Sequence, residues 1–232
     1  MPEQLSTVVI EPTATHTATV IWLHGLGDSG VGWLFLTEEL GPRFPYIKWI
    51  LPNAPLKPIT FFGEGALVNA WFNINSFEKK AHLEKIDEEG MLESVGLVGQ
   101  LIQNERNQGM PSQRILLGGF SQGKLLRDAF IIVSTSHQLA GVVACSGWLA
   151  LGEKLDSFGC DMNKQIPILM CHGEEDAVVA FRFGRATAKY LTKKGYSIQF
   201  NSYPNLAHAA DPKEIADISE FIAKCLPVIS KL

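Results

Sequence analysis

The stretch LLGGFSQGKLLRDAF, residues 116–130, decides the fold because it runs a short apolar segment into a serine flanked by glycines. Its centre, Gly119 to Gly123, matches the pattern G-x-S-x-G, in which a strand turns sharply into a helix around a serine. Such a turn strains the dihedral angles of the serine, and the two glycines remove Cβ atoms that would clash. The hydroxyl group then stands at a helix N-terminus, where the dipole favours developing negative charge. The pattern therefore predicts that Ser121 is a nucleophile.

Short apolar runs bounded by glycine or proline alternate with stretches of helical period along the rest of the chain. Buried strands are expected at residues 18–25, 46–55, 113–121, 139–148, 166–173 and 196–204. Helices are expected at residues 90–109, 181–195 and 211–226. This alternation predicts an α/β fold, with a mostly parallel sheet and helices on both faces. No repeat or low-complexity linker divides the chain, so we expect residues 1–232 to form a single domain.

The helices carry start and stop signals. Gly109 and Gly195 end the first two, and Asp211 with Pro212 fits the N-cap and first position of the third. One face of the first helix is apolar, at Met91, Val95, Val98 and Ile102. Residues 52–87 and 150–165 fit neither period, and long connections of this kind tend to lie over the site in α/β proteins.

Composition limits the function classes. The chain has 232 residues, 46% hydrophobic and 19% charged, with net charge −4, which is enough for one large core. A slightly acidic chain without Lys/Arg runs argues against nucleic acid as the partner. No apolar run reaches the roughly 18 residues of a membrane span, and no signal peptide is visible.

Cysteine use and the last residues bear on location. Cysteines at positions 145, 160, 171 and 225 form no C-x-x-C pair, which favours a reducing, cytoplasmic compartment. The final Ser230-Lys231-Leu232 matches a peroxisomal address, although an ordinary tail can carry the same three residues.

A nucleophilic serine needs a base, and the base needs an orienting carboxylate, in the chain order Ser, Asp/Glu, His. Of the histidines after Ser121, His208 follows the last strand and precedes the last helix, where the base is expected; His137 and His172 fit loop and structural positions. For the acid, the run Glu174-Glu175-Asp176 offers three carboxylates. Asp176 directly precedes an apolar run and is expected to turn inward. Glu174 and Glu175 are expected to face solvent.

A tetrahedral intermediate also needs N–H donors aimed at its oxyanion. One is the N–H after the nucleophile, on Gln122, and the other comes from the loop after an early strand. The segment His24-Gly25-Leu26 fits that loop, with Leu26 as the donor. The six histidines show no i, i+4 pair, and no phosphate-binding G-x-x-x-x-G-K-[ST] is present, so we expect no metal and no cofactor.

Several motifs in this order resemble one family. ATVIWLHGLGDSGVGW, LPNAP, AWF, GGFSQG, CHGEEDAVV and the final histidine resemble the acyl-protein thioesterases, or lysophospholipase/carboxylesterase group, from about residue 18 to residue 224. The resemblance implies an α/β-hydrolase that removes fatty acyl groups from protein cysteines. It implies Ser121, Asp176 and His208 as the catalytic triad, with Leu26 and Gln122 as backbone donors.

The resemblance further implies an acyl tunnel roofed by the loops that begin near Phe61 and after Trp148. Its expected walls are Trp71, Phe72, Trp148 and Val178, which could equally be core residues. Expected partners are S-acylated proteins or lipid esters, with transient contact to a membrane surface, and the chain is expected to be a monomer or weak homodimer.

Two departures from the family pattern stand out. After GFSQG the family continues with small residues, whereas this chain continues KLLRD, placing Lys124, Arg127 and Asp128 on one stripe of the expected helix. Three outcomes are open: Lys124 or Arg127 pairs with Asp128 or another acid, the stripe faces solvent because the covering loop is displaced, or the segment is not a regular helix. We favour the second. Ala210 also stands where the family often has a hydroxyl residue.

Three hypotheses follow. The first is a serine hydrolase that cleaves S-acyl thioesters of proteins. The second is a carboxylesterase or lysophospholipase acting on small lipid or short-chain esters. The third is a hydrolase-fold binding protein with little activity, which a complete triad disfavours.

Overall fold

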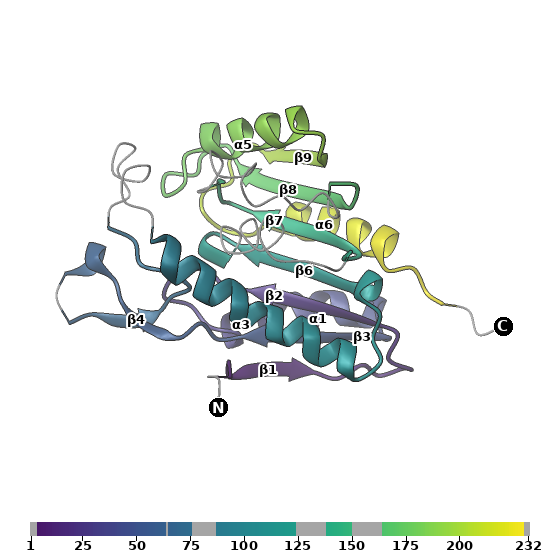
Figure 1. The fold of residues 1–232 in the computed structure, drawn as a ribbon. Coiled ribbons are helices and arrows are strands. Elements are labelled where there is room, and N and C mark those ends of the chain that lie inside the picture. The colour runs from purple at the N-terminus through teal and green to yellow at the C-terminus, as the bar shows by residue number, and fades with distance from the viewer. Residues whose placement is uncertain (1–3, 64, 76–86, 124–137, 150–163, 230–232) are drawn as a thin grey trace.

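The computed structural model describes residues 4–63, 65–75, 87–123, 138–149 and 164–229. Its centre is a seven-stranded sheet of order β1-β3-β2-β6-β7-β8-β9, in which only β1 is antiparallel to its neighbour (Figure 1). The strands are β1 Thr7–Ile10, β2 Ala18–Leu23, β3 Ile47–Pro52, β6 Ile115–Phe120, β7 Gly141–Cys145, β8 Pro167–Gly173 and β9 Ser197–Tyr203. The six expected strands are confirmed. The half-exposed edge strand β1 was not predicted.

Helices cover both faces of the sheet, as expected. The α-helices are α1 Leu34–Leu40, α3 Glu88–Asn107, α5 Phe181–Lys193 and α6 Pro212–Cys225, and the short 3₁₀ helices are η1 Val31–Trp33, η2 Gly41–Arg43, η3 Thr60–Phe62 and η4 Ser112–Arg114. The Asp211 carboxylate accepts a hydrogen bond from the Glu214 N–H and so caps α6. Gly109 and Gly195 adopt φ of 95° and 89° just after α3 and α5, the left-handed conformation typical of a helix stop. The short helix α1 was not predicted.

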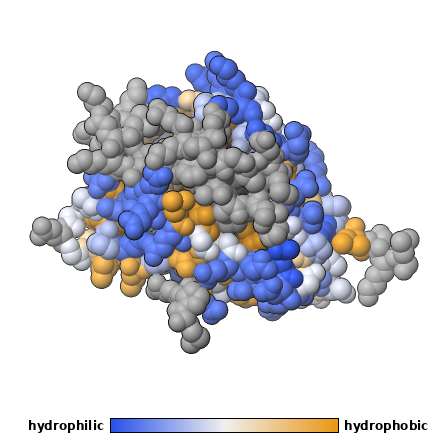
Figure 2. Space-filling view, viewed as in Figure 1, coloured by the Kyte–Doolittle hydropathy of each residue, from blue (hydrophilic) through white to orange (hydrophobic). Residues whose placement is uncertain are grey.

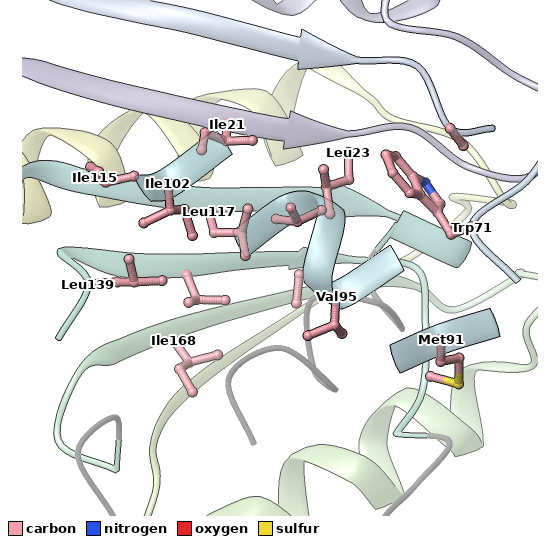
Figure 3. Packing of buried hydrophobic residues seen from close by; sticks show 14 of the residues in the cluster. Ile21, Leu23, Trp71, Met91, Val95, Ile102, Ile115, Leu117, Leu139 and Ile168 are labelled. Atoms are coloured by element: carbon pink, nitrogen blue, oxygen red, sulfur yellow. The ribbon is translucent and has the colours of Figure 1, made fainter. Parts of the chain in front are cut away.

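Each buried strand sends alternate side chains to opposite faces, which gives the molecule two hydrophobic cores. Ile21 and Leu23 of β2 belong to the core under α3 and α5, whereas Val20 and Trp22 belong to the core under α1 and α6. Figure 3 shows the first core, where residues of α3, including Val95 and Ile102, lie against the strands. The apolar face expected for α3 is therefore its buried face.

The segment 52–87, which fits no period, contains a small hairpin. Strands β4 Leu56–Pro58 and β5 Leu67–Asn69 pair antiparallel and are separated in the chain by η3. The Asn69 carbonyl oxygen accepts a hydrogen bond of 2.8 Å from the Gly27 N–H, so the hairpin contacts the loop after β2. This contact places the hairpin beside the expected oxyanion loop.

Residues 122 and 123 begin a helix directly after β6, as expected. The predicted stripe of Lys124, Arg127 and Asp128, the loop at 150–163 and the C-terminal Ser-Lys-Leu lie outside the described residues. Within the described ranges, no helix is both long and apolar enough to cross a membrane.

Candidate active site

Ser121 sits in a strained turn immediately after β6. Its φ is +52°, in the left-handed region that a residue with a side chain rarely adopts. A Cβ on Gly119 would lie 2.9 Å from the Gly123 backbone, and a Cβ on Gly123 would lie 2.5 Å from the Leu23 carbonyl oxygen. Both glycines are therefore required by close backbone approach, as the sequence pattern predicts.

His208 joins Ser121 to Asp176. The Nδ1 of His208 lies 2.7 Å from Asp176 Oδ2, and its Nε2 lies 2.9 Å from Ser121 Oγ. A carboxylate can only accept, so Nδ1 carries the proton and donates it to Asp176. The Nε2 lone pair then faces the serine hydroxyl, the orientation that a general base needs. The Phe120 ring, 4.8 Å from the imidazole between centroids, packs against this histidine.

Asp176 is held as a buried, ionised acceptor. Its Oδ1 accepts hydrogen bonds from the N–H groups of Val178 (2.9 Å) and Val179 (2.7 Å), and its Oδ2 binds His208. Burial opposes ionisation, but hydrogen bonds from His172 and His208 and the charge of His208 prevail and hold the pKa of Asp176 well below its usual range. Asp176 thus remains a carboxylate at neutral pH and fixes the His208 tautomer.

The other carboxylates and histidines lie as the sequence reasoning expected where they are described. Glu174 and Glu175 are exposed. His172 is buried, and its Nε2 lies 2.8 Å from the Val179 carbonyl oxygen and 3.4 Å from Asp176 Oδ2, so it supports the acid. His137 lies outside the described residues.

The loop after β2 is held in place by His24. The Ala54 N–H donates to its Nε2 (3.0 Å), so the proton is on Nδ1, which donates to the Gly25 carbonyl oxygen (2.6 Å). Burial lowers the pKa of His24 despite that backbone hydrogen bond, which keeps the ring neutral. The indole Nε1 of Trp71 donates to the His24 carbonyl oxygen at 2.9 Å. The loop that carries Leu26 is thereby fixed on both sides.

The side chain of Gln122 is a feature that the sequence reasoning missed. It accepts a hydrogen bond from the Trp71 N–H (2.9 Å) and donates one to the Phe72 carbonyl oxygen (2.7 Å), and it is 1% exposed. The Ser94 hydroxyl of α3 donates to the Trp71 carbonyl oxygen. Gln122 therefore ties the serine turn to residues 71–72, which in turn hold the loop of Leu26.

A cavity of about 260 Å³ opens next to Ser121 and His208. Leu26 and Gln122, the expected donors, both line it, and Trp148 and Val178 of the expected walls line it as well. The other described lining residues are mostly apolar: Gly25, Asp28, Phe62, Ile74, Phe120 and Val179.

The positions of Trp71 and Phe72 revise our expectation for the cavity. They are 0% and 4% exposed and belong to the hydrophobic core, outside the described lining. The hydrogen bonds to His24 and Gln122 draw this segment inward, so its residues support the site and do not form its wall. Figure 3 shows Trp71 among the core residues near the ends of the strands.

A mostly parallel sheet, a strained serine after a central strand, and a histidine and aspartate hydrogen-bonded in a row define the class of α/β-hydrolases. The sequence comparison gives the family: a model described as Phospholipase/Carboxylesterase matches residues 5–226, and the chain belongs to that family. It is a serine hydrolase.

Individual relatives agree with this assignment. Acyl-protein thioesterase 1 of Cryptococcus neoformans is 41% identical over 97% of this chain and 100% of its own length. The protein of the same name from Schizosaccharomyces pombe is 44% identical over 82% of this chain and 83% of its own. The crystal structure of Zea mays acyl-protein thioesterase 2 matches with a TM-score of 0.83 and 32% identity, covering 95% of this chain and 99% of that one.

Proposed function

We propose that this protein is an acyl-protein thioesterase that removes fatty acyl groups from S-acylated protein cysteines. The observation that carries the proposal is the hydrogen-bonded row Ser121–His208–Asp176 beside a largely apolar cavity. The full-length similarity to acyl-protein thioesterase 1 supports the same substrate class.

The reaction begins with attack of Ser121 Oγ on the thioester carbonyl carbon, while His208 Nε2 takes the hydroxyl proton. The carbonyl oxygen becomes an oxyanion, which the backbone N–H groups of Leu26 and Gln122 stabilise. The carbon–sulfur bond then breaks, the cysteine leaves as a thiol with the proton from His208, and the acyl group stays on Ser121. Asp176 stabilises the imidazolium that forms in between.

Water completes the cycle. His208 removes a proton from a water molecule, which attacks the acyl-enzyme carbonyl. The second tetrahedral intermediate then collapses: the bond to Ser121 Oγ breaks, His208 returns the proton to that oxygen, and the free fatty acid is released. Leu26, Phe62, Ile74 and Trp148 supply apolar surface for the acyl chain, and each methylene buried there adds about 0.8 kcal/mol to binding.

Ester hydrolysis of lysophospholipids or small carboxylesters is the second candidate. The description of the matching family, Phospholipase/Carboxylesterase, favours ester hydrolysis. This reaction needs the same serine, histidine and apolar cavity as thioester hydrolysis. A non-enzymatic role receives no support from the site.

The surroundings of the substrate bear on partners and location. Large apolar side chains are exposed around η3 and the β4–β5 hairpin, at Leu56, Phe61, Phe62 and Leu67, and Figure 2 shows apolar atoms at the lower left edge, in the region of β4. They support transient contact with a membrane surface. Cys145 and Cys171, neighbours on β7 and β8, are reduced thiols, which supports a cytoplasmic location. Peroxisomal import through the final Ser-Lys-Leu is the alternative. For the oligomeric state, we propose a monomer or a weak homodimer.

The test is a parallel measurement of kcat/KM on an S-palmitoyl-cysteine peptide, lysophosphatidylcholine and p-nitrophenyl esters, with Ser121→Ala as the matched control. We expect the peptide to give the highest value and Ser121→Ala to lose about 10⁶-fold in kcat. A fluorophosphonate probe should label the parent and leave Ser121→Ala unlabelled. Higher kcat/KM on lysophosphatidylcholine would favour the second candidate. Activity of Ser121→Ala within about tenfold of the parent would exclude Ser121 as the nucleophile.

A further inference from the structure

Three buried side chains that the reaction does not use meet on the face of the sheet opposite α3. Cys145 ends β7, Cys171 lies beside it in β8, and Glu214 stands in the first turn of α6. Their thiol and carboxylate atoms all lie within 4.8 Å of one another. The three residues are 1%, 1% and 0% exposed.

The carboxylate of Glu214 is the unusual member of this cluster. Neither of its oxygens accepts a hydrogen bond from an N–H or O–H group of the described residues, and none of the ion pairs among those residues includes it. The thiol of Cys145 does interact with the carboxylate, but a thiol is only a weak donor. Buried polar groups normally have full partners, and a poorly satisfied one calls for an explanation such as a bound ion. The closeness of the carboxylate to the two sulfur atoms points to a ligand between them.

We propose that Cys145, Cys171 and Glu214 bind a zinc ion. Thiolate sulfur favours zinc over magnesium or calcium, which prefer oxygen donors. Zinc is tetrahedral, with bonds of about 2.3 Å to sulfur and 2.0–2.2 Å to oxygen, so two donors on one ion lie about 3.5–3.8 Å apart. The donor atoms of the cluster lie within 4.8 Å of one another, so binding an ion would draw them together by up to about 1 Å.

The neighbours of the cluster favour a fixed geometry. The Tyr203 hydroxyl lies 3.3 Å from Cys171 Sγ and donates to Asp217 of α6 at 2.8 Å, so the ring is held beside the sulfur. Hydrogen bonds around the ligands orient them in metal sites. A bound ion would join β7, β8 and α6.

This site lies close to the nucleophile without containing it. The Cys145 carbonyl oxygen accepts the hydrogen bond of the Ser121 N–H (2.9 Å), and the Cys171 carbonyl oxygen accepts that of Ser146 (2.9 Å). Zinc at the cluster would stabilise the strand ends behind the serine turn. Its role is therefore structural, and hydrolysis itself does not require it.

The experiment uses the full chain, stripped of metal with a chelator and then titrated with zinc or with cadmium as a spectroscopic probe. We expect one equivalent to bind, thiolate-to-cadmium charge-transfer absorption in the near ultraviolet, and a Tm rise of roughly 5–10 °C at zinc concentrations about 100 times Kd. Cys145→Ser, Cys171→Ser and Glu214→Gln should each weaken binding at least about tenfold.

Two controls locate the ion. Cys225→Ser changes a thiol outside the cluster, and His208→Ala removes the histidine of the active site; both should bind zinc as the parent does. Absence of charge-transfer absorption in the parent refutes the proposal even if the cluster variants fail to fold. The proposal is also refuted if zinc binding is lost in His208→Ala and kept in Cys145→Ser, because the ion would then lie at the active site.

Discussion

Replacing Gln122 with alanine tests whether the serine turn and the oxyanion loop are held together by one side chain. The backbone N–H of residue 122 is unchanged by this substitution, so the expected donor remains. What is lost are the hydrogen bonds to the Trp71 N–H (2.9 Å) and the Phe72 carbonyl oxygen (2.7 Å). Both backbone groups are buried, and each unsatisfied group costs about 1–3 kcal/mol. The free energy of unfolding should therefore fall by about 2–6 kcal/mol.

Activity should fall with stability. Trp71 also donates to the His24 carbonyl oxygen, so a displaced residue 71 releases the loop that carries Leu26. Complete loss of one oxyanion donor costs about 10²–10³-fold in kcat, and a loosened donor should cost about 10- to 100-fold. Urea denaturation and p-nitrophenyl ester turnover measure the two effects.

Gln103→Ala is the matched control. Gln103 lies on the exposed surface of α3, where its amide bonds to Asn107 in solvent. Its replacement should change the free energy of unfolding by no more than about 0.5 kcal/mol. If Gln122→Ala were as mild as this control and kept full turnover, the coupling between the serine turn and the loop would be refuted.

Three further perturbations probe the site and the buried cluster. Asp176→Asn should lower kcat about 10⁴-fold, because it removes the acceptor that fixes the His208 tautomer. Glu175→Gln changes an exposed residue and should leave kcat nearly unchanged. The opposite result would mean that the acid is misassigned. Acyl chains of about eight carbons or more should be hydrolysed with higher kcat/KM than acetyl, because each buried methylene adds about 0.8 kcal/mol, and a flat chain-length profile would contradict a buried acyl site. Burial raises the pKa of Glu214 to about 8, so in metal-free protein its contribution to stability is complete below the unfolded pKa of about 4.3 and is lost as pH rises toward 8, at about 1.4 kcal/mol per pH unit. Urea denaturation should show that the Glu214→Gln variant lacks this pH-dependent loss. Parallel pH profiles of the free energy of unfolding for parent and variant would contradict the prediction.

The strands and the residues that meet beside the cavity were predictable because local patterns encode them. A strand covered on both faces is a short apolar run whatever its neighbours, so β2, β3 and β6–β9 could be read from the sequence. The strained turn at Ser121 was predicted from its two glycines, and the inward position of Asp176 from the apolar residues that follow it. The edge strand β1 and the short helix α1 carry no comparable signal, because one is half-exposed and the other has only 7 residues.

The walls of the cavity were only partly predictable because they depend on contacts between distant segments. Trp71 and Trp148 look alike in sequence, as aromatic residues within irregular segments. Trp71 turns inward because its indole and backbone find partners on His24 and Gln122, whereas Trp148 lines the cavity. The proposed zinc ligands, which the sequence reasoning did not expect, were hidden for the same reason: the pairing of β7 with β8 and the packing of α6 bring residues 145, 171 and 214 together. Two expectations stay predictions. One is the effect of Lys124 and Arg127 on the helix after Ser121, and the other is the single domain over residues 1–232.

The strain at Ser121 is tolerated because hydrogen bonds continue the sheet beyond the ends of its strands. The Ser121 N–H donates to the Cys145 carbonyl oxygen, the Ser146 N–H to Cys171, and the Glu174 N–H to Tyr203, each at 2.9 Å. Ser121 and Ser146 both adopt a φ of +52°, so two adjacent strands leave the sheet in the same way. A left-handed residue costs about 1–3 kcal/mol and persists only where its surroundings determine it. The register of β6 against β7 therefore helps to determine where the Ser121 hydroxyl stands relative to His208.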